Sequence, residues 1–221
     1  MRVEVVVPWQ PNGCPHRQAA WEWVQARYRV QHPDWTVTAC GPGGGEWCKA
    51  VGVNAAAARS FADVLVVADA DVWTTNLQVA VDAVDDGAPW VIPHKLVHRL
   101  TETATGALLA GHVATETCEQ PYVGIQGGGI VVLPRLTLLD VPMDERFVGW
   151  GQEDQSWGVA LHYLTGPAVR FDAGLLHLWH PPQLRQDRKV GSEAGRRLHR
   201  EYLKARPDPV AIRSILEGAR T

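Results

Sequence analysis

The stretch that most constrains the fold is an apolar run ending in two carboxylates, Asp63 to Trp73, which reads DVLVVADADVW. A short, continuous run of apolar and β-branched residues, without alternation, is typical of a strand buried on both faces of a parallel sheet. Asp69 and Asp71 follow this run directly. In open α/β sheets, ligands collect at the carboxyl ends of such strands. The stretch therefore predicts a strand that carries two acidic side chains into a ligand site.

Two carboxylates one residue apart repel each other and lose hydration at a cost, and a divalent cation relieves both effects. We interpret Asp69 and Asp71 as candidate ligands of a metal that would hold a phosphorylated molecule. The alternative is a strand followed by a polar turn, in which one Asp caps the next helix. An Asp-x-Asp tripeptide alone does not decide between the two.

The rest of the chain alternates strand and helix signals. Apolar periodicity predicts strands at Val3–Val7, Trp35–Cys40, Trp90–Ile92, Ile130–Leu133 and Val169–Phe171, and helices at Arg17–Gln31 and Lys49–Phe61, after Thr75 or Asn76, and around Trp157 and Leu161. Pro93 to Gln126 shows no sustained period, so we expect an irregular, ligand-facing excursion whose lone histidines, including His94, are surface residues. The order predicts an α/β fold: a single Rossmann-like domain with a central, mostly parallel sheet flanked by helices.

Composition supports one globular domain, because 221 residues that are 46% hydrophobic and 20% charged can bury a sizeable core. The net charge of -3 gives no overall field that would recruit nucleic acid or an anionic membrane. No apolar run reaches the roughly 20 residues of a membrane span, and Met1–Val7 lacks signal-peptide features, so we expect a cytoplasmic protein without a membrane span. The four cysteines show no CxxC pairing, which favours reduced thiols.

A basic segment runs from Arg185 to Arg206. A solvated helix face explains it at least as well as any function does. The functional interpretation is a basic lid over a diphosphate, or a contact for an anionic acceptor. We therefore divide the chain into a domain at residues 1–182 and a basic C-terminal helical extension or lid at residues 183–221.

Three clusters of ionisable residues fall at loop ends of this framework: Asp69 with Asp71, Glu153 with Asp154, and His177 with His180. Mn²⁺ or Mg²⁺ takes carboxylate oxygens, Mn²⁺ also accepts imidazole, and both keep positions open for phosphate oxygens. A second acidic pair could serve the other substrate, since a carboxylate beside an attacking hydroxyl can take its proton. Trp150 lies between two glycines and could stack on a sugar face.

One segment resembles a known enzyme signature. Residues 147–154, FVGWGQED, resemble the Gly-Trp-Gly-Gly-Glu-Asp signature of β-1,4-galactosyltransferase-like enzymes and related bacterial and phage transferases, which are GT-A-type glycosyltransferases. Further similar features appear in the same order along Met1 to Pro182: Lys49, Asn54 and the alanine-rich helix before Asp69-Ala-Asp71; Gly127–Gly129 with Ile130–Pro134; and His177 and His180, where the family places its third metal ligand.

The resemblance implies roles for particular residues. On the donor side, Asp69 and Asp71 would bind the metal-bridged nucleotide, and one of His177 and His180 would complete the metal sphere. Lys49 and Asn54 would contact the donor. On the acceptor side, Asp154 would be the catalytic base, and the acceptor would be held by Glu153, Trp150 and Gly151. The donor half would span residues 1–93 and the acceptor half residues 127–182. Gln152 and Gln155 depart from the signature, which leaves the acceptor open.

The resulting hypothesis is a metal-dependent glycosyltransferase that uses Mn²⁺ or Mg²⁺. It would move a sugar from a UDP- or GDP-sugar to a hydroxyl of a glycan, a protein, a lipid-linked sugar or a hydroxylated nucleic-acid base. Asp154 as base favours inversion. One rival is a haloacid-dehalogenase-like phosphohydrolase, but position 73 is Trp and the acidic strand is not the first. The other rival is a nucleotide- or sugar-binding module without turnover.

Overall fold

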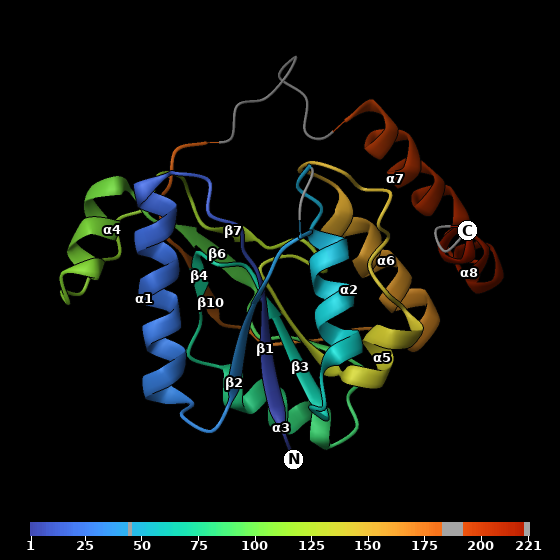
Figure 1. Ribbon diagram of the computed structural model, residues 1–221, viewed down its shortest axis with the longest axis horizontal. Helices are drawn as coiled ribbons and strands as arrows, with labels where there is room; N and C mark the ends of the chain where they lie inside the picture. The colour runs from blue at the N-terminus through green and yellow to red at the C-terminus, as the bar shows by residue number, and fades with distance from the viewer. Residues whose placement is uncertain (44–45, 183–191, 219–221) are drawn as a thin grey trace.

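The computed structural model describes residues 1–43, 46–182 and 192–218, so the parts of the expected extension at 183–191 and 219–221 lie outside the described residues. A six-stranded sheet forms the centre of the molecule (Figure 1). Its strands, in spatial order, are β2 (Thr36–Cys40), β1 (Val3–Pro8), β3 (Val64–Ala68), β8 (Ile130–Pro134), β5 (Val91–Ile92) and β9 (Val169–Arg170).

This sheet is mostly parallel, as the sequence predicts. β1 runs parallel to β2 and β3, and β9 runs parallel to β5. β8 runs antiparallel to both of its neighbours, β3 and β5. Because β8 is reversed, its first residue, Ile130, lies opposite Ala68 at the end of β3. The glycines that precede β8 therefore reach the same edge of the sheet as the carboxylates that follow β3.

Helices cover both faces of the sheet. Val64 and Val66 of β3 pack into one core cluster with α1 (Pro15–Gln31) and α3 (Leu77–Asp85). Leu65 and Val67 pack into the opposite cluster with α2 (Lys49–Arg59), α5 (Arg135–Asp140) and α6 (Glu153–Thr165). Successive side chains of a strand point to opposite faces, and both faces are covered here. That coverage explains the continuous apolar run of β3.

A second, four-stranded sheet lies beside the first. Its order is β4 (Val72–Trp73), β10 (Gly174–His177), β6 (Leu96–Arg99) and β7 (Tyr122–Val123). The expectation of an irregular stretch at 93–126 is therefore wrong in part, since β6, β7 and α4 (Glu102–Leu109) lie there. β6 pairs with β10, far away in the sequence. Pairing of this kind leaves no local periodicity that a sequence pattern could show.

The C-terminal helices α7 (Glu193–Ala205) and α8 (Pro209–Glu217) pack against α6 (Figure 1). Their apolar side chains join the core cluster of α2 and α6: Leu198, Tyr202, Ile212 and Leu216. The basic side chains Arg197, Arg200 and Lys204 are exposed. Within the described ranges, no helix combines the length and the apolar character needed to cross a bilayer.

Candidate active site

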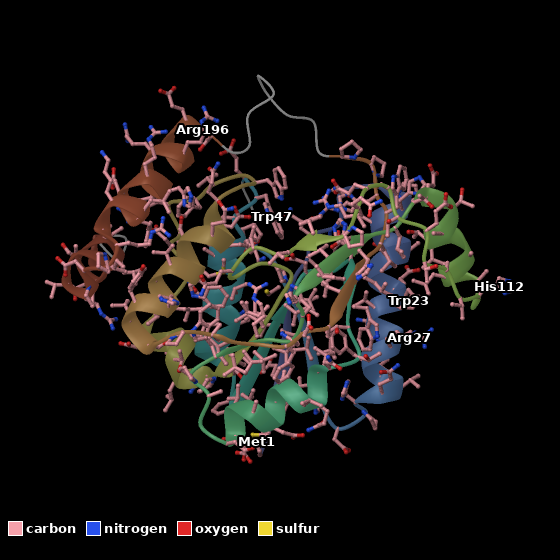
Figure 2. The ribbon with its side chains drawn as sticks, turned by 180° about the vertical axis from the view of Figure 1, so that it is seen from behind. Met1, Trp23, Arg27, Trp47, His112 and Arg196 are labelled. Atoms are coloured by element: carbon pink, nitrogen blue, oxygen red, sulfur yellow. The ribbon has the colours of Figure 1, made fainter. Side chains whose placement is uncertain are left out.

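A cleft of about 340 Å³ opens where the two sheets meet, a volume suited to a small-molecule ligand. Eight of the ten residues selected from the sequence line it: Lys49, Asp69, Asp71, Trp150, Glu153, Asp154, His177 and His180. Trp47, labelled in Figure 2, also belongs to the lining. Residues that are more than 100 positions apart in the chain therefore meet in one site.

One group in the cleft has the composition of a metal site. Asp71 lies in the turn between β3 and β4, and His177 ends β10. β10 pairs with β4, and the backbone N–H of Leu178 donates to the Asp71 carbonyl oxygen at 2.8 Å, so the two segments are held together. The Nε2 atoms of His177 and His180 lie 3.7 and 3.2 Å from the Asp71 carboxylate oxygens.

The donor set fits a divalent cation. One carboxylate oxygen and two imidazole nitrogens, from Asp71, His177 and His180, lie within 4.8 Å of one another. The Nδ1 atom of His180 is 2.9 Å from the Pro181 carbonyl oxygen, and a hydrogen bond there leaves Nε2 as the ligand nitrogen. A hydrogen bond to Asp71 raises the pKa of His180, so a proton lies where a cation could replace it.

The charge of Asp71 is maintained in spite of its burial. Burial alone would raise the pKa of this carboxyl, but His177, His180 and Arg17 together hold it well below its usual range. The pKa of His177 is lowered by burial, which keeps its imidazole neutral and able to ligate. The group therefore combines an ionised carboxylate with a neutral imidazole.

Asp69 is held by a different partner. The Lys49 ammonium lies 2.7 Å from Asp69 Oδ1 and 2.7 Å from Asp154 Oδ1, so one buried cation bridges the two carboxylates. Burial would lower the pKa of Lys49, but Asp154 and Asp69 raise it above its usual range. The structure thus brings Asp71 and both histidines together as one group, and links Asp69 to Asp154 through Lys49.

The second acidic pair begins α6. Burial raises the pKa of Asp154 to about 7; Asp69 and Glu153 add to this rise, and Lys49 opposes it. Burial also raises the pKa of Glu153, whose Oε2 accepts a hydrogen bond from the Gly151 N–H at 2.7 Å. Asp154 is therefore poised to change its protonation state near neutral pH, as a general base must.

The glycines before β8 allow this close packing. A Cβ atom added at Gly127 would collide with the backbone carbonyl oxygen of Asp154, and one added at Gly128 would lie 3.5 Å from Asp154 Oδ2. Gly127 also has a φ of 92°, a region that favours glycine. Gly127 is therefore needed for the approach of α6 to the sheet edge.

Two selected residues do not line the cleft. The Asn54 amide donates to the Met143 carbonyl oxygen at 2.8 Å and to Glu145 Oε1 at 2.9 Å, and its Oδ1 accepts from the Met143 N–H. Asn54 thus fixes the segment after α5, and this placement does not support donor contact. Gly151 contacts the cleft residue Glu153 through its backbone N–H.

Sequence reasoning missed several lining residues: Arg17, Trp47, His94, Arg99 and Tyr122. The Arg17 guanidinium lies 4.0 Å from Asp71 Oδ2. Its position after the first strand was a usable signal, because ligands gather at that edge. His94, expected at the surface, is 1% exposed. It follows β5, and the same rule would have selected it.

No protein-family model and no curated protein matches the chain. Solved structures do. A mutant Drosophila β-1,4-galactosyltransferase 7 in complex with manganese, UDP-Gal and xylobiose aligns with 90% of this chain and 79% of its own, at 14% identity and a TM-score of 0.54. The fold is GT-A-like.

A second GT-A neighbour supports this assignment. GalNAc-T7 in complex with UDP, GalNAc and Mn²⁺ aligns with 99% of this chain at 10% identity and a TM-score of 0.55. This chain spans 55% of the length of that protein. The predicted α/β fold of the GT-A type is confirmed. At these identities the likeness concerns the fold, and function has to be argued from the site.

Proposed function

We propose that this protein is a metal-dependent glycosyltransferase that moves a sugar from a UDP- or GDP-sugar to an acceptor hydroxyl. The observation that carries the proposal is the composition of the cleft. It contains a metal-type group and, across one buried lysine, a carboxylate with a pKa of about 7. The two named neighbours, which contain Mn²⁺ with UDP or UDP-Gal, support the same class of donor.

The donor side would be formed by Asp71, His177 and His180, which would hold the cation. Two imidazoles beside one carboxylate favour Mn²⁺ over Mg²⁺, which prefers oxygen ligands. When bound, the cation supplies Lewis-acid stabilisation of the charge on the departing nucleoside diphosphate. Arg17 and Arg99 also line the cleft and add positive charge on this side.

On the acceptor side, Asp154 would take the proton of the attacking hydroxyl. The acceptor oxygen forms a bond to the anomeric carbon while the bond from that carbon to the diphosphate oxygen breaks, and the proton passes to the Asp154 carboxylate. Lys49, 2.7 Å away, orients this carboxylate. Trp150 is 42% exposed and offers its ring to the acceptor, beside Glu153. Attack opposite the leaving group inverts the anomeric centre.

The test is the release of nucleoside diphosphate from a panel of UDP- and GDP-sugars, with Mn²⁺ and with glycan, peptide and hydroxymethylated-DNA acceptors. General-base catalysis is worth about 10²- to 10⁴-fold in rate, so Asp154→Asn should lose at least 100-fold while still binding UDP or GDP. Asp172→Asn is the matched control, because its carboxylate is exposed and lies outside the cleft.

Other outcomes would favour a different function. Hydrolysis of p-nitrophenyl phosphate that survives Asp154→Asn and is lost with Asp69→Ala would favour the phosphohydrolase. Metal-dependent nucleotide binding without consumption of any donor would favour a binding module. Transfer by Asp154→Asn at near wild-type rate would show that another group is the base.

A further inference from the structure

The cleft contains a buried histidine to which the proposed reaction gives no role. His94 follows the carboxyl end of β5 and lines the cleft. Its side chain is almost fully buried, and its Nδ1 has no hydrogen-bond partner among the residues that the structure describes. Most buried polar atoms in folded proteins have a partner, so an exception needs an explanation. The other ring nitrogen, Nε2, is the one next to the cleft-lining glycines Gly124 and Gly129.

Two glycines of the cleft lining pack against the edge of this imidazole that carries Nε2. A Cβ atom added at Gly124 would lie 3.1 Å from His94 Nε2, and one added at Gly129 would lie 3.3 Å from the same atom. Both glycines line the cleft. Any larger residue at either position would cover the ring edge. The local sequence therefore places no side chain from these two positions against Nε2.

The position of His94 falls between the two halves of the proposed reaction. The carbonyl oxygen of Gly129 accepts a hydrogen bond from the Asp69 N–H at 2.9 Å, and a Cβ atom at Gly128 would lie 3.5 Å from Asp154 Oδ2. The glycine run thus lies beside the backbone of Asp69 and close to the Asp154 carboxylate. The transferred sugar has to lie between the leaving diphosphate and the base, and so over His94.

The charge state of His94 suits a hydroxyl group. Burial lowers its pKa to about 4, and Arg170 adds to this effect. The guanidinium of Arg170 donates to the Gly124 carbonyl oxygen at 3.0 Å. A neutral imidazole offers one hydrogen-bond donor and one acceptor without net charge. It matches a sugar hydroxyl better than a phosphate, which attracts cations.

We propose that His94 is a recognition residue for the transferred sugar. Its imidazole hydrogen-bonds one sugar hydroxyl through Nε2, beside Gly124 and Gly129. The inference rests on the proposed function, because it needs a nucleotide-sugar donor in the cleft. It adds a residue that selects the sugar, separate from those that hold the nucleotide and the metal.

The experiment compares the binding of a nucleotide with that of its sugar conjugates. Calorimetry with Mn²⁺ gives dissociation constants for UDP, UDP-glucose, UDP-galactose, GDP and GDP-mannose, and the readout is the affinity ratio of conjugate to nucleotide. One hydrogen bond is worth about fivefold to tenfold in affinity, so His94→Ala should lower the ratio by that factor and leave UDP or GDP binding unchanged. His94→Gln should recover part of the loss.

A second variant covers the ring without removing it. Gly124→Ala should lower the ratio as His94→Ala does, because its methyl group would lie against His94 Nε2. Gly106→Ala is the matched control, since a Cβ atom there meets open space on α4. A ratio that stays unchanged in His94→Ala, whether or not nucleotide binding falls, would overturn the inference while the proposed function stands. A wild-type protein that binds no nucleotide with Mn²⁺ would overturn both.

Discussion

Lys49 offers the sharpest test of the electrostatic arrangement. Its buried ammonium is 2.7 Å from carboxylate oxygens of both Asp69 and Asp154. Lys49→Met keeps most of the length of the side chain and removes the charge. Two carboxylates then face each other in the cleft without the cation between them. We expect a large loss of stability that depends on pH.

The magnitude follows from burial. Removing one partner of a buried ion pair costs about 3–5 kcal/mol, because the other charge is left without a partner. The Asp69 side chain is 33% exposed and recovers part of its hydration, whereas Asp154 is 17% exposed. We therefore expect the lower end of that range, about 3 kcal/mol at pH 8, with most of it from Asp154.

The pH dependence has a defined sign. Asp154 has a pKa of about 7 in the folded chain, above the value of about 3.9 for a free Asp. Between these values the folded state holds a proton that the unfolded chain has released, so stability falls as pH rises through the window. Without Lys49, which lowers this pKa, the fall extends to higher pH. The loss in Lys49→Met should therefore shrink to about 1 kcal/mol at pH 5.5.

Urea unfolding at pH 5.5 and pH 8 measures these differences in the free energy of unfolding. Lys49→Met/Asp154→Asn should recover part of the loss at pH 8, since the buried charge is gone. Lys95→Met is the control, because Lys95 pairs with exposed Asp172 at 3.2 Å, and a surface pair is worth about 0–1 kcal/mol. If Lys49→Met cost no more than Lys95→Met at pH 8, or lost the same free energy at both pH values, the reasoning would be refuted.

Three further predictions follow from the site. His177→Ala and His180→Ala should each weaken Mn²⁺ binding at least about tenfold in a calorimetric titration. His98→Ala is the control, because His98 lies outside the metal-type group, and it should leave Mn²⁺ binding unchanged. Equal effects of all three variants would contradict the assignment of His177 and His180 as metal ligands. The transfer rate at saturating Mn²⁺ should rise about tenfold per pH unit below pH 7 and level off above it, as Asp154 loses its proton; a profile flat from pH 5 to 8 would exclude Asp154 as the base. Gln152→Gly should raise the free energy of unfolding by about 1 kcal/mol in chemical denaturation, because Gln152 has a φ of 68°, in the left-handed region that favours glycine. A loss of stability would show that the side-chain contacts of Gln152 outweigh the backbone strain.

The sequence predicted those features that depend on local pattern. The apolar run of β3 and the carboxylates at its end are an example, since burial on both faces leaves a visible signature. The close approach of Gly127 to Asp154 requires a residue without a side chain, and the run Gly127–Gly129 is visible in the sequence. The placement of Asn54 could also have been foreseen. Lys49 and Asn54 are five residues apart, or about 140° around a helix, so they cannot both face the cleft.

Other features depend on contacts between distant segments and left no local signal. The pairing of β6 with β10 and β7 is one example. The bridge formed by Lys49 is another, because it joins residues 20 and 105 positions away. The left-handed backbone of Gln152 was not predictable from its residue type, because residues other than glycine rarely adopt a positive φ. Its position in the glycosyltransferase-like signature, where glycine is usual, was the available hint.

The packing of α7 and α8 has a consequence for biosynthesis. Leu198 and Tyr202 of α7 and Ile212 of α8 belong to the core cluster that contains Trp157 and Leu161 of α6. On the ribosome, this core cluster is incomplete until both later helices have emerged. The opposite face of the sheet, with α1 and α3, can close earlier, because those helices are made first. We therefore expect a nascent chain stalled after α6 to bind chaperones through the half of the molecule that carries Asp154.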